Sequence, residues 1–193
     1  MPELPEVEVL VRHLEPLLIN KTVRSVQVYR KKSIRPTAPQ RMSDKLADAK
    51  FKSVTRRAKY LLFEMKPSGR APAFTLLGHL GMTGRMFLQS KTMQLPKHTA
   101  VVLELDRHNL VFEDTRYFGR LTLDVASLDA LGPEPLSDEF DGKILRKALN
   151  RSTQAIKVKL LDQSVVAGIG NIYASEILFQ AGISPRKAAG RLT

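Results

Sequence analysis

The chain has 193 residues, enough for one large or two small domains. Its hydrophobic content of 43% is ordinary for a globular protein, but 31 Lys and Arg against 19 Asp and Glu give a net charge of +12. This excess favours a polyanionic partner, with nucleic acid ahead of an anionic membrane. The absence of cysteine excludes disulfides and cysteine-ligated zinc from this chain. No apolar run approaches the ~18 residues of a membrane span, and no secretory signal pattern is present, so we expect a soluble intracellular protein.

The first eight residues, MPELPEVE, can place a nucleophile at the chain terminus. Removal of Met1 would leave Pro2 as a free secondary amine, and an α-amino group has a pKa of about 7.7–8.0, so much of it is unprotonated near neutral pH. Such an amine can attack an electrophilic sugar carbon and form a Schiff base, with the adjacent Glu3 donating or accepting the proton. The alternative is that Pro2 and Pro5 stiffen a leader while Glu3 and Glu6 favour the start of a helix.

Apolar residues spaced three and four apart predict an amphipathic helix from Pro5 to about Leu18, with Pro16 ending or kinking its last turn. From Thr22 to Val125 the apolar period shortens to that of strands separated by polar or Gly/Pro turns. The predicted strands are Thr22–Tyr29, Phe51–Thr55, Tyr60–Met65, Ala73–Leu80, Arg85–Leu88, Ala100–Leu105, Leu110–Glu113 and Leu121–Val125. Many short strands at this spacing indicate a β-sandwich or flattened barrel.

Residues 126–142 contain five acidic residues, no Lys or Arg, and the helix breaker GPEP, which is typical of an inter-domain linker. Beyond this segment the helical period returns. The predicted helices are Lys143–Asn150, Thr153–Leu161 and Asn171–Ala181. Asn171 fits an N-cap and Gly182 a C′ residue. The last two helices, on either side of a Gly-rich turn, resemble DNA-binding helix-turn-helix arrangements.

Two motifs place special side chains in tight turns. In RRAKYLL three cations precede an apolar strand, so Lys59 can bind a phosphate of the DNA backbone. The alternative is that the segment is an ordinary solvated basic turn. In GHLGMTGR three glycines surround Met82 and favour a displayed loop. A methionine presented in this way can enter a base stack and replace an extruded base. The alternative is that Met82 fills the core.

Two further motifs combine cations with aromatic or capping residues. In DTRYFGR, cationic and aromatic residues alternate, so Arg116 can reach base edges and Phe118 can stack on a base. The alternative is that the motif is the end of a strand with an Arg–Asp pair. His98 can contact phosphate. Lys157 and Asn171 flank the GIG turn, where a helix N-terminus near lysines forms a phosphate site. An ordinary capped helix explains Asn171 equally well.

Each motif is weak alone, but their order is specific. The segments MPELPEVE, RRAKYLL, HLGMTGR, DTRYFG, LGPEPLSDEF and LLDQSVVAGIGNIYASEILFQAGI closely resemble the bacterial formamidopyrimidine-DNA glycosylase family from residue 1 to about 185. The PELPE start is closer to this family than to its endonuclease VIII relatives, which typically begin PEGPE. We therefore expect an α+β fold. An N-terminal helix and a two-sheet β-sandwich form a catalytic domain (1–125), a linker follows (126–142), and a partial helix-two-turn-helix DNA-binding domain completes the chain (143–193).

The resemblance implies a bifunctional base-excision-repair enzyme that removes oxidised purines, such as 8-oxoguanine and formamidopyrimidines, and acts as an abasic-site lyase. Pro2 matches the nucleophile that attacks C1′ of the flipped nucleoside. Glu3 matches the acid/base that helps to open the sugar ring, and Lys59 matches the lysine for phosphate contact and proton transfer in β-elimination. Glu6 matches a helix-start glutamate near the active site.

Other matching positions concern DNA contact. The trio that fills the vacated stack and meets the orphaned cytosine is matched by Met82, Arg116 and Phe118. The family contacts DNA phosphates at the positions of His98, Arg151, Lys157 and Asn171. Tyr117 departs from the pattern, because the family commonly has a second arginine there, and this change removes one potential phosphate contact.

The family continues with further helices, a lesion-capping loop and a four-cysteine zinc finger, whereas this sequence stops at Thr193. We therefore expect a truncated chain with no metal and no other cofactor. The implied partner is double-stranded DNA with an oxidised purine or an abasic site, bound by a monomer in the bacterial cytoplasm at the nucleoid, with no membrane association. The alternative is a DNA-binding fragment of the same family with weak or no catalysis. A third interpretation, a basic structural protein of the translation or nucleoid machinery, accounts for the charge but for none of the ordered motifs.

Overall fold

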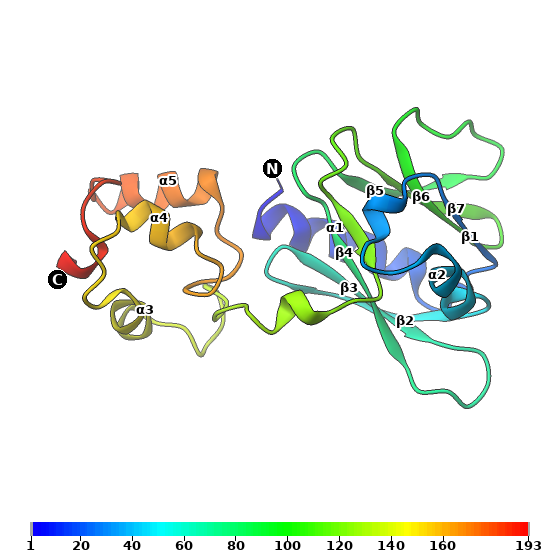
Figure 1. Ribbon diagram of the computed structural model, residues 1–193, viewed down its shortest axis with the longest axis horizontal. Helices are drawn as coiled ribbons and strands as arrows, with labels where there is room; N and C mark the ends of the chain where they lie inside the picture. Colours follow the sequence, from blue (N-terminus) through cyan, green and yellow to red (C-terminus); the bar gives the residue numbers. More distant parts are fainter. Residues whose placement is uncertain (1, 193) are drawn as a thin grey trace. The chain divides into compact units, whose positions relative to one another are not determined.

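The computed structural model describes residues 2–192, which divide into two compact units between Val125 and Ala126 (Figure 1). Each unit has its own hydrophobic core. Within the described range, no helix has both the length and the apolar character that crossing a bilayer requires.

The first unit begins with helix α1 (Leu4–Leu18), as the apolar spacing predicts. Its buried side chains follow the i, i+3, i+4 pattern, and the helix packs against the second and third strands. Pro16 lies in the last turn, where its missing N–H removes one backbone hydrogen bond. The helix ends two residues later, which agrees with the prediction that Pro16 limits it.

Two four-stranded antiparallel sheets follow, with strand orders β1-β6-β7-β5 and β2-β3-β4-β8. The strands are β1 (Ser25–Val28), β2 (Lys50–Arg57), β3 (Tyr60–Lys66), β4 (Phe74–His79), β5 (Arg85–Ser90), β6 (Thr99–Glu104), β7 (His108–Glu113) and β8 (Arg120–Thr122). Each predicted strand is present, with ends that differ by up to three residues. The two-sheet α+β fold is therefore confirmed.

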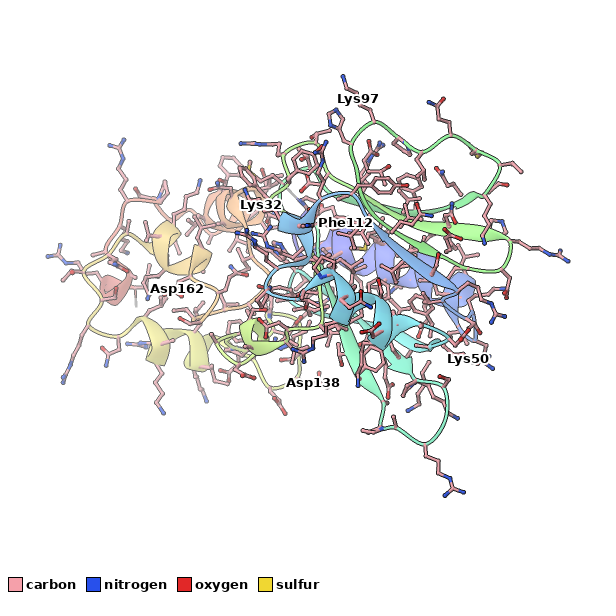
Figure 2. The ribbon with its side chains drawn as sticks, turned by 45° about the vertical axis from the view of Figure 1, so that its right-hand side comes forward. Lys32, Lys50, Lys97, Phe112, Asp138 and Asp162 are labelled. Carbon is pink, nitrogen blue, oxygen red and sulfur yellow. The ribbon has the colours of Figure 1, made fainter. Side chains whose placement is uncertain are left out.

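Buried side chains that alternate with more exposed ones along the strands pack between the two sheets. In β3 every second side chain is buried, and the ring of Phe63 meets that of Phe51 edge-on with centroids 5.8 Å apart. Phe112 from β7, labelled in Figure 2, is also buried in this core. Burying each such side chain contributes roughly 1.5–3 kcal/mol, so the core gives the loops at the strand ends a rigid base.

The sequence did not predict two short helices of the first unit, η1 (Lys31–Ile34) and α2 (Pro39–Leu46). Helix α2 buries only Met42 and Leu46, one turn apart. Two apolar residues do not form a periodic signal, so only Pro39 at the start of the helix could have indicated it.

The second unit contains three α-helices, with short 3-10 segments near its two ends. They are η2 (Ala126–Leu128), α3 (Gly142–Leu149), α4 (Ile156–Leu161), α5 (Asn171–Gln180) and η3 (Ala189–Arg191). The prediction that Asn171 is an N-cap is wrong, because Gly170 occupies the cap and Asn171 is the first helical residue. Gly182 is the C′ residue, as predicted. It has φ +63°, its N–H donates to Phe179, and the N–H of Ile183 donates to Leu178.

Candidate functional site

The start of α1 positions two of the predicted catalytic residues. Pro2 is half-buried directly before the helix, and Glu3 is the N-cap, with only 1% of its surface exposed. The Glu3 carboxylate accepts the backbone N–H of Glu6, while the Glu6 carboxylate accepts the backbone N–H of Glu3 at 2.9 Å. This reciprocal capping box confirms the helix-start interpretation of both glutamates and holds a buried carboxyl group next to Pro2.

Lys59 lies in the two-residue turn that joins β2 to β3, where Ala58 has φ +52°. It is 8% exposed, so the interpretation as a solvated basic turn is wrong for this side chain. Burial lowers the pKa of Lys59 below its ordinary value, and the negative charge of Glu3 partly opposes this shift. The fold therefore brings Glu3 and Lys59 into one electrostatic pair.

An ion pair that the sequence did not predict ties α1 to this turn. Arg56 is 14% exposed; its Nε donates to Glu8 Oε2 at 2.8 Å and its Nη1 donates to the carbonyl of Ala58 at 3.0 Å. Hydrogen bonds from Arg56, and then from Arg12, lower the pKa of Glu8. Glu8 and Arg56 are far apart in the sequence, so no local pattern could indicate that they help to place Lys59.

His79 at the end of β4 is a further neighbour of Lys59. Burial, followed by the positive charges of Lys59 and Arg120, lowers the pKa of His79 to about 4. Its Nδ1 accepts the backbone N–H of Gly81 at 3.2 Å, and its ring centroid is 4.8 Å from that of Tyr60. His79 is therefore neutral at pH 7. It belongs to the GHLGMTGR motif, but the sequence assigned it no role.

The structure brings together the three residues predicted to enter the base stack. Met82 and Phe118 are 42% and 47% exposed, so the interpretation of Met82 as core filler is wrong. Their loops touch through the backbone, because a Cβ added to Gly81 would lie 2.6 Å from the backbone nitrogen of Gly119. Arg116 is exposed on the second loop, with its guanidinium carbon 4.9 Å from the centroid of the Phe118 ring.

Asp114 lies beneath these two loops and is fully buried. Its Oδ1 accepts the hydroxyl of Thr83 at 2.6 Å and the backbone N–H of Arg116 at 3.1 Å, and its Oδ2 accepts the backbone N–H of Gly119 at 2.8 Å. Burial raises the pKa of Asp114, but the hydrogen bonds from Thr83 and from the backbone outweigh it, so the pKa lies below its usual value. Asp114 is thus a charged residue shared by both loops.

Tyr117 connects the second loop to other basic side chains. His98 Nδ1 is 3.4 Å from the Tyr117 hydroxyl, and the guanidinium carbon of Arg30 is 4.9 Å from the centroid of the Tyr117 ring. Lys32, labelled in Figure 2, lies 5.7 Å from the centroid of the Phe118 ring. The second loop therefore lies close to the cationic side chains of Arg30 and Lys32.

In the second unit, the structure brings Lys157 and Asn171 together. Lys157 Nζ donates to the hydroxyl of Ser175 at 2.9 Å, and this hydroxyl donates to the backbone carbonyl of Asn171 at 2.8 Å. Arg151 is not part of this chain of hydrogen bonds; it is exposed after α3, with φ +60°. The turn between α4 and α5 is braced by Gln163, whose side chain bonds to Leu161, Gly168 and Ile169.

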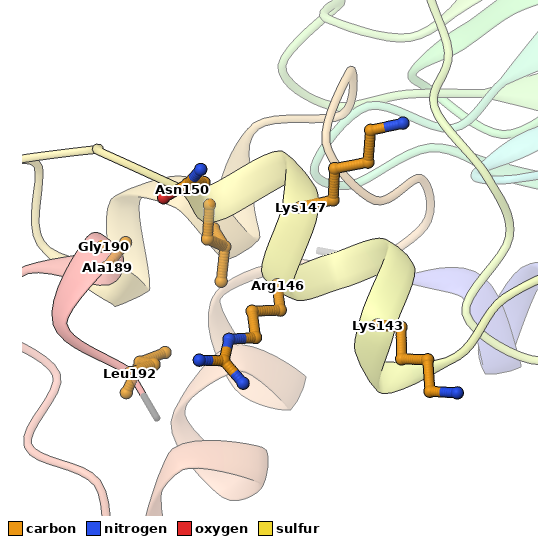
Figure 3. Close-up of a pocket in the computed structure, with 8 residues that line it drawn as sticks. Lys143, Arg146, Lys147, Asn150, Ala189, Gly190 and Leu192 are labelled. Atoms are coloured by element: carbon orange, nitrogen blue, oxygen red, sulfur yellow. The ribbon is translucent and has the colours of Figure 1, made fainter.

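A pocket of the second unit lies between α3 and η3, and Figure 3 shows its basic side chains. None of the predicted site residues lines it. Its lining residues are Lys143, Arg146, Lys147, Leu149, Asn150, Ala189, Gly190 and Leu192. Within residues 2–192, no group of three or more His, Asp or Glu side chains is arranged to hold a metal ion.

Comparisons with known proteins agree with this arrangement. The model of the formamidopyrimidine-DNA glycosylase N-terminal domain matches residues 1–121, and the model of the H2TH domain of the same glycosylase matches residues 131–193. The formamidopyrimidine-DNA glycosylase of Carboxydothermus hydrogenoformans is 40% identical over 193 residues, which cover all of this chain and 70% of that protein. The protein of the same name from Desulforamulus reducens is 41% identical over 202 residues and is covered to 71%.

Solved structures of formamidopyrimidine-DNA glycosylases are also similar to this chain. A complex of Lactococcus lactis Fpg with DNA containing an abasic site has a TM-score of 0.90 and 32% identity; the match covers all of this chain and 71% of that one. The crystal structure of the wild-type L. lactis protein with DNA containing an oxidised pyrimidine has a TM-score of 0.91 and 33% identity, with 100% and 73% coverage. From the family models and from relatives 40% identical over its whole length, the chain belongs to the formamidopyrimidine-DNA glycosylase family.

Proposed function

We propose that the chain is a base-excision DNA glycosylase that removes oxidised purines from double-stranded DNA and cleaves the resulting abasic site through a Schiff base at Pro2. The observation that carries the proposal is the buried Glu3–Lys59 pair beside a proline that can present a free amine. The names of the relatives support a formamidopyrimidine substrate, and the DNA with an abasic site in a solved structure supports the second reaction. We propose that the protein acts as a monomer on bacterial nucleoid DNA and uses groups of its own chain rather than a cofactor.

In the proposed first step, the Pro2 nitrogen attacks C1′ of the damaged nucleoside. The bond between C1′ and the base breaks, and the base leaves with the electron pair and gains a proton. Glu3 is held by the capping box, so its carboxylate can take up the proton that the attacking amine releases and pass it to the ring oxygen as the sugar opens. The secondary amine loses its own proton and becomes an iminium, which is the covalent intermediate.

In the proposed second step, the iminium makes the C2′ proton acidic, and its removal expels the 3′ phosphate. Lys59 suits both the phosphate contact and the proton transfer, because burial lowers its pKa below the ordinary value while Glu3 favours the charged form. The ion pair of Glu8 with Arg56 holds the Lys59 turn against α1. Each catalytic group thus comes from a tightly bonded backbone segment.

We propose two sets of DNA-contacting residues. Met82, Arg116 and Phe118 fill the space of the extruded base, which offsets part of the few kcal/mol that extrusion costs. The phosphate-binding positions are His98, Arg151, Lys157 and Asn171, and the hydrogen-bonded link between Lys157 and Asn171 supports a joint phosphate site in the second unit.

Borohydride trapping tests the covalent step. The chain with Pro2 at its terminus, verified by mass spectrometry, is mixed with duplexes that contain an abasic site or 8-oxoguanine opposite cytosine. We expect a covalent adduct on both. The matched control carries one extra residue before Pro2, which removes the free amine without touching a buried side chain, and should give no adduct. Binding of abasic DNA without any adduct from the free-amine chain would instead support a DNA-binding fragment.

A further inference from the structure

We propose that Asp114 is a positioning residue that locks the loops of Met82 and Phe118 into one rigid wedge. The proposal rests on the proposed function, in which these side chains enter the base stack. The segment 81–84 lies between β4 and β5, and the segment 114–119 lies between β7 and β8. Two loops so far apart in the sequence act together only if something fixes their relative position.

The hydrogen bonds of Asp114 reach both loops. One carboxylate oxygen accepts the hydroxyl of Thr83, the residue after Met82. Two backbone N–H groups of the second loop, those of Arg116 and Gly119, donate to the same carboxylate and flank Phe118 on both sides. Asp114 itself has no exposed surface, whereas Thr83 is exposed, so the carboxylate is fixed mainly from within the protein. Hydrogen bonds to a buried charge are among the stronger ones in proteins.

The backbone atoms of the two loops are in close contact near Asp114. A Cβ on Gly81 would lie 2.6 Å from the Gly119 nitrogen, and a Cβ on Gly119 would lie 2.6 Å from the Phe112 ring and 2.8 Å from the carbonyl of His79. The second loop is therefore pressed onto the end of β4, where His79 also bonds to Gly81. The exposed Met82 and Phe118 stand on a base that is bonded and close-packed.

Rigidity of this kind has a direct effect on insertion into DNA. A wedge that must be ordered during binding loses conformational entropy at that moment, and this loss reduces the gain from filling the stack. A wedge that is ordered before binding avoids the loss. Thr83 and Asp114 touch no DNA in this scheme; they act through Met82 and Phe118.

The test compares Thr83→Val with Thr83→Ser. Valine has the shape of threonine but no hydroxyl, whereas serine keeps the hydroxyl that donates to Asp114. Thr37→Val is the control for the loss of a threonine hydroxyl elsewhere in the unit, because Thr37 is buried and its hydroxyl bonds to Thr122 outside both loops, whereas Thr83 is exposed. The first readout is the fluorescence of 2-aminopurine next to a stable abasic-site analogue in a duplex, which rises when a wedge opens the base step. The second is borohydride trapping on a single-stranded abasic oligonucleotide, where there is no stack to fill.

We expect Thr83→Val to weaken the 2-aminopurine response about tenfold in apparent affinity and to leave single-stranded trapping unchanged. Thr83→Ser and Thr37→Val should match the wild type in both readouts. An equal loss in both readouts for Thr83→Val, or no loss in either, overturns the proposal. A wild-type chain that traps the single strand but gives no fluorescence rise also overturns it, while the proposed function stands. Failure of the wild type to trap is the separate failure of the proposed function.

Discussion

At the scale of single residues, Lys59 is under two opposing influences. Burial disfavours its charged form, and the carboxylate of Glu3 favours it. The attraction between their charges depends on the capping box that fixes Glu3 and on the ion pair of Arg56 that fixes the Lys59 turn. The protonation state of Lys59 is therefore set by residues from two separate elements.

Replacing Glu3 by Gln should lower the pKa of Lys59 further, because the attractive charge is lost while the burial remains. The measurement is the rate at which an amine-reactive reagent labels Lys59 as a function of pH, read by mass spectrometry of the peptide. Glu15→Gln, on the same helix, serves as the control and should leave the Lys59 curve in place. A Lys59 curve that moves to higher pH in Glu3→Gln would contradict the pairing.

His79 makes stability depend on pH. Its pKa falls from 6.5 in the unfolded chain to about 4 in the folded one, so the unfolded chain binds more protons between these values. The stability that depends on neutral His79 is fully present above pH 6.5 and is lost as the pH falls toward 4, by roughly 3 kcal/mol. Urea unfolding of the wild type and of His79→Asn, which keeps an acceptor for Gly81, should show this slope in the wild type only. Parallel pH profiles for the two proteins would refute the assignment.

At the scale of elements, most helices and strands can be predicted from the spacing of apolar residues and from the residue types in the turns. The strands and the helices α1, α3, α4 and α5 follow from apolar spacing, and Gly182 follows from its C′ role. Helix α2 was missed because its two buried side chains form no period. The cap of α5 was misplaced by one residue, since glycine and asparagine both suit that position and only the backbone geometry decides between them.

Gly81, at the base of the wedge, gives an element-scale prediction, with Gly69 in the turn between β3 and β4 as its control. Gly69 and Gly81 both have positive φ, but a Cβ at Gly69 meets nothing, whereas a Cβ at Gly81 meets the backbone of Gly119. Gly69→Ala should therefore cost only the left-handed strain of about 1–2 kcal/mol. Gly81→Ala should cost more than about 3 kcal/mol, because the neighbouring loop must also move. Chemical denaturation of both variants decides the matter, and equal losses would show that the contact between the loops is unimportant.

At the scale of the whole molecule, charge is unevenly distributed. Residues 1–125 contain 22 Lys and Arg against 12 Asp and Glu, a net charge of +10, and residues 126–193 contain 9 against 7, a net charge of +2. We therefore expect the first unit to supply most of the general attraction to DNA. In the second unit, where the net charge is small, we expect the proposed phosphate contacts of Lys157 and Arg151 to depend on where each side chain lies.

Replacing Lys157 by Gln should weaken binding to DNA of any sequence to a similar extent and reduce the slope of log affinity against log salt by about 1. The physical reason is that one phosphate contact releases about one counterion. Fluorescence anisotropy over a salt series measures the slope. Lys50→Gln, at an exposed position of β2, is the matched control. If both variants give the same slope, Lys157 has no special place in the phosphate contact.

Composition indicated a nucleic-acid partner, and the ordered motifs gave the family and the candidate residues Pro2, Glu3 and Lys59. What the sequence could not provide was the set of contacts between distant segments. The bond from Thr83 to Asp114 and the pair of Glu8 with Arg56 exist only in the folded chain. The burial that lowers the pKa of His79 likewise depends on tertiary packing.

The contact between Gly81 and Gly119 has a consequence for the evolution of this sequence. Each glycine faces unyielding backbone or ring atoms, so a mutation that adds a side chain at one cannot be rescued by a change at the other. Each position therefore excludes a side chain independently of the other. Divergence in these loops is left to positions with exposed side chains, such as Thr115.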